Sequence, residues 1–358
     1  MSNFTPTQAF SISGIAVNAE KFGNGHINET LKITTDTGAT YILQRINHYV
    51  FKQPTKVMEN ISRVTNYLLE QTGDSTAALH FVPTKDGTFC HQDADGNYWR
   101  MYEFVEGFCL EAVESAADFY ESAIAFGRFQ QQLLNFPADT LHETIPNFHN
   151  TVDRFRQLKD SIVADVKGRA KDVQAEIEFA LRHEEVGGTL QRMLEKGELP
   201  LRVTHNDTKL NNVLLHPQTR KPLCVLDLDT VMPGLSAHDF GDSIRFGAAT
   251  AAEDEQDPSK MKLNLEYYES FAKGFLEAAT ALTDKEVEVL PYGALIMTLE
   301  VGIRFLKDYL DGDVYFKTAY ETHNLVRCRT QFALVADMEA KWNEMQTVIA
   351  RLHANRKV

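Results

Sequence analysis

The stretch from residue 203 to residue 230 constrains the fold and the chemistry of this chain more than any other. It reads VTHNDTKLNNVLLHPQTRKPLCVLDLDT. Five polar side chains stand in it at fixed spacings: His205, Asp207, Asn212, Asp227 and Asp229. Carboxylate and amide oxygens can ligate Mg²⁺, and a positioned carboxylate can take a proton from a hydroxyl group. The apolar run before Asp227 predicts a buried strand, so we expect these groups on a strand–loop–strand unit.

The first three of these residues have the His-x-Asp-x-x-x-x-Asn spacing of a kinase catalytic loop. This spacing predicts that Asp207 orients and deprotonates an acceptor hydroxyl, while His205 supports the loop. Lys209, two residues after the base, could reach the γ-phosphate of a nucleotide, and a solvated lysine is the alternative. Asp227 and Asp229 would face the same side of a strand because they are two residues apart. The predicted ligands of Mg²⁺ are Asn212, Asp227 and Asp229.

The composition excludes several classes of function. A net charge of −14 without a basic stripe argues against nucleic-acid binding. The four cysteines form no Cys-x-x-Cys pair, which argues against a zinc site and a disulfide framework. Residues 1–14 lack the pattern of a secretory signal, and charged residues interrupt the apolar segment 289–306. We therefore expect a cytoplasmic protein that binds no membrane and has no obligate protein partner.

The order of the predicted elements divides the chain near residue 107. A length of 358 residues exceeds one compact core, so two domains are expected. Alternating patterns and turn signals predict strands at 14–20, 27–35, 40–47, 88–92 and 97–105, with one helix at 54–71. Helical spacing then dominates at 115–136, 149–166, 172–196, 262–281, 284–310 and 330–356. Residues 1–107 would form a small antiparallel sheet with one helix, and residues 108–358 a mainly helical domain.

A glycine-containing loop, residues 22–28 (FGNGHIN), lies between the first two predicted strands. Glycines let the backbone approach phosphate oxygens, to which amide groups can donate. The loop therefore predicts nucleotide binding at Gly23, Asn24 and Gly25. A plain hairpin turn is the alternative for these glycines. His26 either caps the turn or points toward the substrate.

The third predicted strand, YILQRIN, lacks the lysine with which protein kinases hold nucleotide phosphates. Alternation puts Gln44 on the face where that lysine would stand. A glutamine can bond to a phosphate but supplies no charge. Residues 101–105 are similar to a kinase hinge, where backbone groups of Glu103 and Val105 would read adenine. An ordinary strand is the alternative for that segment.

Together these segments resemble the aminoglycoside phosphotransferase-like small-molecule kinases, which include choline, homoserine and methylthioribose kinases. The matching pieces run from residue 23 to residue 331: GNGHIN, YILQRIN, RVTHNDTKLNN, DLDTVMPG, DFGDSIRFGA, IRFLKDYLDGDVYF and HNLVRCRTQ. GDSIRFG and YLDGDVYF are the narrower pieces, and they resemble the N-acetylhexosamine 1-kinases. The resemblance implies an α+β, bilobal protein-kinase-like fold, with a small antiparallel-sheet N-lobe, a larger mainly helical C-lobe and the nucleotide between them.

The resemblance also implies the reaction. ATP and Mg²⁺ would phosphorylate the anomeric C1 hydroxyl of N-acetylglucosamine or N-acetylgalactosamine, with Asp207 as the base. The residues that it places around the sugar are His26, Phe246, Arg304 and Tyr315. A kinase of the same superfamily with an aminoglycoside, choline or homoserine acceptor is the alternative, and an amine acceptor predicts several carboxylates in the pocket. A non-catalytic nucleotide-binding protein would be expected to lose the base or a metal ligand, and this chain has both.

Two further segments have structural interpretations. Arg304 interrupts an apolar helix four residues after Glu300, so an intrahelical salt bridge is the alternative to a substrate contact. In the segment 238–247 (HDFGDSIRFG), we expect Asp239 and Asp242 to hold the catalytic loop and to cap the following helix.

Overall fold

The computed structural model describes residues 5–23 and 27–356. Its contacts form two compact units. The first unit contains the chain up to residue 108, together with residues 135–146 and 214–233. The second unit contains residues 109–134, 147–213 and the chain from residue 234 onwards. The sequence analysis assigned everything after residue 107 to the helical domain, whereas the contacts group 135–146 and 214–233 with the sheet.

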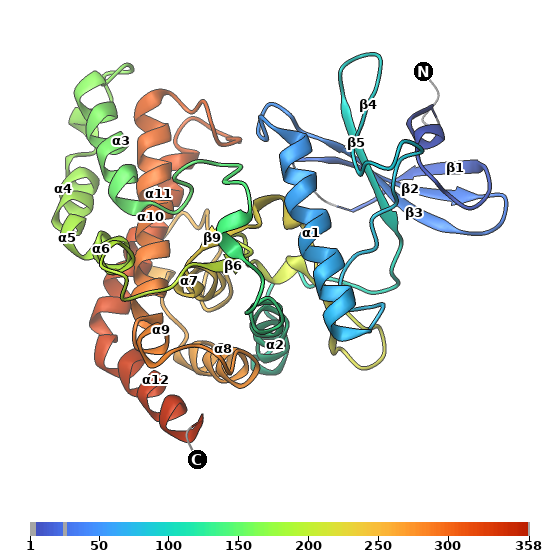
Figure 1. The fold of residues 1–358 in the computed structure, drawn as a ribbon. Coiled ribbons are helices and arrows are strands. Elements are labelled where there is room, and N and C mark those ends of the chain that lie inside the picture. The colour runs from blue at the N-terminus through green and yellow to red at the C-terminus, as the bar shows by residue number, and fades with distance from the viewer. Residues whose placement is uncertain (1–4, 24–26, 357–358) are drawn as a thin grey trace. The chain divides into compact units, whose positions relative to one another are not determined.

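The first unit is built on a five-stranded antiparallel sheet (Figure 1). Its strands are β1 (Ala16–Lys21), β2 (Glu29–Thr35), β3 (Thr40–Ile46), β4 (His91–Gln92) and β5 (Tyr98–Glu103), in the order β1-β2-β3-β5-β4. A turn with Gly38 at φ 83° joins β2 to β3, and glycine adopts this left-handed conformation without a steric cost. One face of the sheet buries an apolar cluster that includes Ile33, Leu43 and Met101. The predicted small antiparallel sheet is confirmed.

Helix α1 (Pro54–Thr72) also belongs to the first unit and begins with a proline, which suits the first helical turn. The apolar stripe predicted for it is buried: Val57, Ile61, Val64 and Leu68. Its Asn60 amide donates to the Val231 carbonyl at 3.0 Å and to the His142 carbonyl at 2.8 Å. These bonds tie the helix to the chain just after the acidic pair Asp227 and Asp229, so α1 helps to position that loop.

The acidic pair follows a short hairpin of β7 (Val213–Leu215) and β8 (Pro222–Val225). Asp227 comes two residues after the end of β8 and has φ 54°, a left-handed conformation that aspartate tolerates better than most residues. A 3-10 turn at Leu228–Thr230 then contacts α1, and β9 (Met232–Gly234) follows. The predicted strand before the carboxylates is therefore present, but Asp229 lies on the turn and not on the strand.

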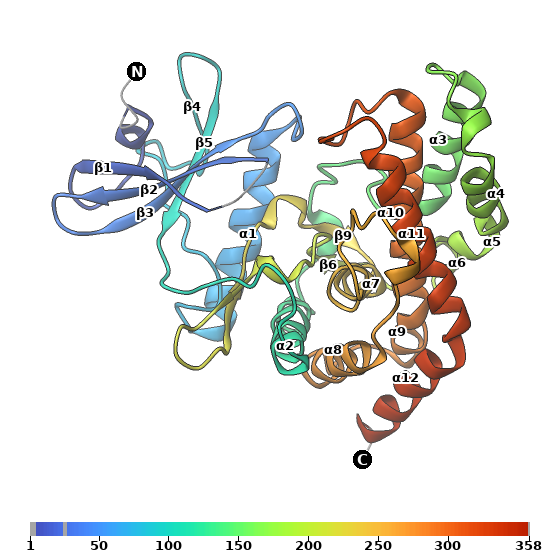
Figure 2. The same ribbon diagram turned by 180° about the vertical axis from the view of Figure 1, so that it is seen from behind.

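The second unit is mainly helical and surrounds one long buried helix, α10 (Leu290–Asp311). Helices α3, α7 and α11 pack against it (Figure 2). A short strand, β6 (Arg202–Thr204), precedes the catalytic loop. The other helices of this unit are α2 (Ala116–Gln132), α3 (Thr151–Ala164), α4 (Gln174–Arg182), α5 (Glu184–Gly187), α6 (Thr189–Glu195), α7 (Ser236–Gly247), α8 (Leu265–Ala278), α9 (Asp284–Glu288), α11 (His323–Ala340) and α12 (Trp342–Arg356). Among the described residues, no helix is long and apolar enough to cross a membrane.

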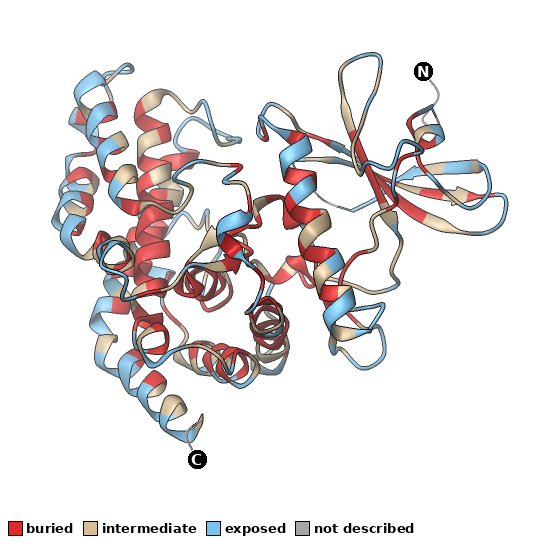
Figure 3. Ribbon diagram, in the orientation of Figure 1, coloured by how far each residue is buried: buried red, intermediate tan, exposed pale blue. Residues whose placement is uncertain are grey.

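Helix α7 corrects one expectation. Asp239 and Asp242 were expected to cap the helix that follows segment 238–247, but the helix begins at Ser236 and contains both residues. Its glycines lower helix propensity, and one of them allows a close crossing with α10. A Cβ atom on Gly241 would lie 2.1 Å from the Gly293 carbonyl oxygen. Almost all of α7 and α10 is buried (Figure 3), so close packing outweighs the weak propensity.

Candidate active site

The loop after β6 brings together three of the predicted site residues. The Lys209 ammonium lies 2.9 Å from Asp207 Oδ1. The Asn212 amide donates to the Asp207 carbonyl at 2.8 Å and to Asp207 Oδ2 at 3.3 Å. The Asp207 side chain is 26% exposed. A carboxylate at the surface of this unit, held by an amide and a lysine, has the geometry expected of a positioned base.

The electrostatics of this loop favour the ionised form of Asp207. Burial is the largest influence and would raise the pKa of Asp207, but the charge and hydrogen bond of Lys209 oppose it. The net effect holds the pKa of Asp207 below its ordinary value. Asp207 is therefore ionised at neutral pH, as a proton acceptor must be.

Helix α7 holds the backbone on both sides of Asp207. Asp239 accepts the amide N–H groups of His205 at 2.9 Å and Asn206 at 2.8 Å. Asp242 accepts the amide of Thr208 at 2.9 Å. The expectation that these two carboxylates hold the catalytic loop is confirmed, although they act from within a helix and not as caps.

A residue that sequence reasoning missed, His149, supports the same loop. Its Nε2 lies 3.2 Å from the Asn206 carbonyl oxygen and its Nδ1 lies 2.9 Å from Glu300 Oε1. The other oxygen of Glu300 accepts the Thr151 hydroxyl at 2.6 Å. Glu300 is fully buried, and both of its oxygens are engaged by residues other than Arg304. The alternative of a salt bridge between Glu300 and Arg304 is therefore wrong.

These contacts keep the Glu300 carboxylate ionised. Burial is again the largest influence and would raise the pKa of Glu300, whereas the hydrogen bond and charge of His149 and the charge of Arg154 oppose it. The balance lowers the pKa of Glu300 to about 2. A carboxylate this deep in the helical unit is thus stable only as part of its network.

Arg304 and Tyr315 lie together in a group of aromatic rings. The Arg304 guanidinium carbon is 5.5 Å from the Phe148 ring centre, 5.9 Å from that of Tyr315 and 5.5 Å from that of Phe316. Within the described part of the chain it has no carboxylate partner. We call Arg304, Phe148, Tyr315 and Phe316 the arginine–aromatic cluster. Its half-buried cation keeps its hydrogen-bonding groups available to a ligand.

The position of Tyr315 depends on Asp308, which the sequence analysis did not single out. The Asp308 carboxylate, on the last turns of α10, accepts the amides of Val314 at 3.0 Å, Tyr315 at 2.8 Å and Phe316 at 2.9 Å. Tyr315 itself is 64% exposed. Three bonds to one buried carboxylate fix the backbone of the loop, so that the exposed ring has a defined place beside Arg304.

Phe246 is not brought into this cluster. Phe246 lies near the end of α7 and is half-buried, and the described residues include no aromatic contact that joins it to the cluster. His26 lies outside the described residues, as do Asn24 and Gly25. Gly23 is described and has φ 72° with open space around its Cα. The predicted roles of these residues in ligand binding stay predictions.

In the first unit, Gln44 is part of a buried polar network. Its carbonyl oxygen accepts from Arg100 Nε at 2.8 Å, and its amide donates to the Thr30 hydroxyl at 3.0 Å. Arg100 stands opposite Gln44 on β5, and it forms a bidentate ion pair with Asp229. Both charged side chains are only 3% exposed. The cation on this face of the sheet therefore comes from β5, where sequence reasoning did not look for it.

Both oxygens of Asp229 are occupied by protein groups. Arg100 contacts each of them, and the Asn28 amide donates to Oδ2 at 2.7 Å. A cation at Asp229 would have to compete with the Arg100 guanidinium. Within residues 5–23 and 27–356, no three histidine, cysteine or acidic side chains cluster as a metal site. The predicted Mg²⁺ ligands differ from such a cluster, because they are one amide, Asn212, and two carboxylates, Asp227 and Asp229. Phosphate oxygens of the nucleotide would complete this ligand set.

The predicted hinge is the end of β5. The amide of Glu103 donates to the His80 carbonyl at 2.9 Å, and Glu103 pairs with Tyr41 of β3. An adenine contact at this residue would have to use its carbonyl oxygen. Val105 follows the strand. The hinge roles of Glu103 and Val105 stay predictions.

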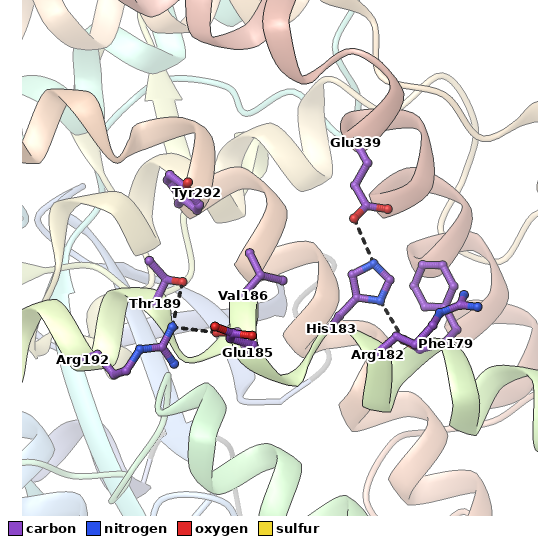
Figure 4. A pocket seen from close by; sticks show the side chains of 9 residues that line it. All are labelled: Phe179, Arg182, His183, Glu185, Val186, Thr189, Arg192, Tyr292 and Glu339. Atoms are coloured by element: carbon purple, nitrogen blue, oxygen red, sulfur yellow. Dashed lines mark hydrogen bonds and ion pairs between the residues drawn. The ribbon is translucent and has the colours of Figure 1, made fainter.

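A pocket of about 680 Å³ on the second unit lies among other helices (Figure 4). Its walls come from α4, α5, α6, the start of α10 and the end of α11, and none of the predicted site residues contributes to it. His183 contacts Glu339 across it at 3.1 Å, and Arg192 donates to the Glu185 carbonyl at 2.8 Å. Its polar groups are thus largely paired with each other, and we do not assign the chemistry to it.

A comparison with protein-family models finds one family whose match covers the catalytic loop and the acidic pair. A model of the phosphotransferase enzyme family, APH, matches residues 18–275, from β1 to α8. The chain belongs to the APH phosphotransferase family. It is therefore a small-molecule phosphotransferase, and the match includes the Asp207 loop and the Asp227 turn.

Solved structures similar to this APH phosphotransferase show the same fold at low sequence identity. Amicoumacin kinase hAmiN, in complex with AMP-PNP, Ca²⁺ and Ami, is 14% identical with a TM-score of 0.62, over 92% of this chain and 91% of that one. The microcompartment-associated aminopropanol kinase is 16% identical with a TM-score of 0.60, over 96% and 98%. Choline kinase from Cryptosporidium parvum Iowa II is 15% identical with a TM-score of 0.58, over 92% and 91%. The predicted protein-kinase-like α+β fold is confirmed.

Proposed function

We propose that this phosphotransferase uses ATP and Mg²⁺ to phosphorylate the anomeric C1 hydroxyl of an N-acetylhexosamine, N-acetylglucosamine or N-acetylgalactosamine. The observation that carries the proposal is the arginine–aromatic cluster of the second unit. An arginine without a carboxylate partner, among three rings, suits a neutral ligand with many oxygen atoms. Aromatic rings pack on the apolar face of a sugar, while the guanidinium donates to its hydroxyl or acetamido oxygens.

A route of packed residues joins this cluster to the base. Phe148 contacts Arg304, and the neighbouring His149 contacts the Asn206 carbonyl, which is one residue before Asp207. The acceptor contacts and the catalytic loop are thus parts of one network in the second unit. This network connects the cluster to the backbone that leads into Asp207, the base that we propose for the sugar hydroxyl.

The state of Asp207 fits an acidic hydroxyl. Lys209 lowers the pKa of Asp207 despite burial, so this carboxylate is a weak base. The anomeric hydroxyl is the most acidic hydroxyl of a reducing sugar, and it can be activated by a base whose pKa is not raised. Lys209 would also reach the transferred phosphate, so we propose both Asp207 and Lys209 as catalytic residues.

The charges near the cluster disfavour an amine acceptor. Arg304 and Arg154 would both repel a cationic group, and the charge of Arg304 lowers the pKa of Arg154 after the larger effect of burial. The carboxylates of Glu300 and Asp308 are buried and committed to protein groups. Several free carboxylates would be expected for an aminoglycoside or choline acceptor. The similar structures of amine kinases share only the fold with this chain, so their acceptors do not indicate the acceptor of this chain.

The nucleotide and metal would use the residues predicted from the sequence. We propose Asn212 and Asp227 as ligands of Mg²⁺, since their amide and carboxylate oxygens suit this cation. Held by these residues, the cation would supply positive charge against the charge that develops on the transferred phosphate. Asp229 is the weaker candidate because Arg100 holds both of its oxygens. The proposed nucleotide contacts are Gly23, Asn24, Gly25, Gln44, Glu103 and Val105, and the remaining sugar contacts are His26 and Phe246.

ATP consumption against a panel of acceptors tests the proposal. The panel contains N-acetylglucosamine, N-acetylgalactosamine, glucose, choline, 1-amino-2-propanol and an aminoglycoside. The expected result is turnover with the two N-acetylhexosamines, weak turnover with glucose and none with the amines. Turnover with only an amine would contradict the proposal and favour the other acceptor class.

A further inference from the structure

His149 stands between two groups that accept hydrogen bonds. Its Nε2 is 3.2 Å from the carbonyl oxygen of Asn206, and its Nδ1 is 2.9 Å from Glu300 Oε1. The imidazole is 7% exposed and the Glu300 side chain is 0% exposed. A carbonyl oxygen and an ionised carboxylate only accept, whereas a neutral imidazole has one N–H donor. Both contacts can be hydrogen bonds only if both ring nitrogens carry a proton.

We propose that His149 is held as an imidazolium between Glu300 and Asn206, and that it positions the Asp207 loop. It is a positioning residue, because it acts through the Asn206 carbonyl and does not touch the reacting atoms. The inference rests on the proposed role of Asp207 as the base. It does not depend on which acceptor the enzyme uses.

The contact fixes the peptide group that leads into Asp207. Asn206 has φ 63°, a left-handed conformation that its surroundings must maintain. Its amide donates to Asp239 of α7, and its carbonyl faces His149. The backbone of Asn206 is thus held by α7 at its N–H, and by the α10 carboxylate, through His149, at its carbonyl. A neutral His149 would turn a lone pair toward one of its two acceptors and weaken this hold.

Of the charged groups around His149, the ionised Glu300 carboxylate is the one that stabilises a second proton on the His149 ring. Two cations also belong to this network: the charge of Arg154 of α3 acts on Glu300, and Arg304 of α10 lies against Phe148. His238 of α7 lies with its ring centre 5.3 Å away. Burial and, next, the charge of His149 lower the pKa of His238 to about 3, so His238 is neutral and does not take the proton. Glu300 is the carboxylate in contact with His149, and its pKa near 2 keeps it ionised.

The first test is the protonation state of His149 in the ligand-free enzyme. Histidine ¹⁵N–¹H correlation spectra at pH 6 and pH 8 show directly whether each ring nitrogen bears hydrogen, and the signal is assigned by its loss in His149→Gln. The expected result is an imidazolium at both pH values. A neutral ring at pH 8, with one bare nitrogen, would overturn the proposal. This measurement uses the wild-type chain and needs no acceptor.

The second test is the pH profile of kcat in Glu300→Gln, which keeps the side-chain shape and removes the charge. Without its carboxylate, the His149 ring has no counter-charge for a second proton, so it should become neutral as pH rises. Activity that needs the cation is then present at low pH and lost at high pH. We expect kcat of Glu300→Gln to fall roughly tenfold between pH 5.5 and 8.5, a fall that wild type lacks, with the KM for ATP little changed. A profile parallel to wild type would refute the positioning role.

His183 supplies a matched control (Figure 4). It is also a buried histidine between a carbonyl and a carboxylate, with Nδ1 2.7 Å from the Phe179 carbonyl and Nε2 3.1 Å from Glu339. It lies among the outer helices, so His183→Gln should leave kcat unchanged while His149→Gln lowers it. If an amine were the acceptor and His149 still an imidazolium, only the proposed sugar function would fail. If a hexosamine were turned over and His149 were neutral, only this inference would fail.

Discussion

Replacing Arg100 by methionine leaves the Asp229 carboxylate buried without its cation. Both side chains are 3% exposed, and burying an unpaired charge is among the costliest single changes in a protein. Removing one partner of a buried ion pair destabilises by about 3–5 kcal/mol. The lost hydrogen bond to Gln44 adds about 1 kcal/mol. At about 2–4 °C for each kcal/mol, we expect the melting temperature to fall by about 8–24 °C.

Thermal unfolding followed by circular dichroism measures this fall in melting temperature. Two further variants test whether the buried charge causes it. Arg100→Met combined with Asp229→Asn leaves no buried charge, so it should recover most of the loss. Arg45→Met is the control, because Arg45 on β3 forms an ion pair with Glu29 in which both side chains are about half exposed. That exposed pair contributes less than about 1 kcal/mol. The reasoning is refuted if Arg100→Met melts within about 2 °C of Arg45→Met, or if the double variant melts no higher than Arg100→Met.

Three further predictions concern the site. Asp207→Asn should lower kcat by at least ~10² because the proposed base is lost, with nucleotide binding by calorimetry unchanged; near-normal turnover would remove Asp207 from its role. Lys209→Met should raise the pKa of Asp207, since burial then acts unopposed, so the acid limb of the kcat/KM profile should move to higher pH; an unmoved limb would show that Lys209 does not set the charge of the base. Arg304→Ala should raise the KM for the hexosamine roughly tenfold or more, the loss of one charged hydrogen bond, with the KM for ATP little changed; equal effects on both substrates would place Arg304 outside the acceptor site.

Local patterns predicted the strands of the sheet because alternation and turn signals lie within a few neighbouring residues. Alternating apolar residues and the Asp36-Thr37-Gly38 turn predicted β2 and β3 within two residues of their bounds. The same alternation put Gln44 on the face opposite Leu43 of the apolar cluster. Helical spacing also predicted the apolar stripe of α1. The 172–196 segment was harder, since its periodic pattern runs through the breaks that separate α4, α5 and α6.

The residues that support the site escaped prediction because their partners are distant in the sequence. Arg100 and Asp229 are separated by 129 positions, and His149 and Glu300 by 151. No periodicity or motif links such pairs, and each residue alone is consistent with a solvated surface. Asp308 carried a weak signal, an aspartate in an apolar segment three residues before an Asp-Gly-Asp turn. Helix α7 was missed because its glycines serve packing against α10, which a propensity argument does not include.

The position of the phosphate in the product tests the central claim most directly. The enzyme is incubated with ATP, Mg²⁺ and N-acetylglucosamine, and the product is examined by ³¹P and ¹H NMR. A sugar 1-phosphate is expected, in which the phosphorus couples to the anomeric proton, and Asp207→Asn should form almost none of it in the same time. A phosphorus signal coupled to the C6 protons, or no sugar phosphate although an amine acceptor is phosphorylated, would contradict the proposed function.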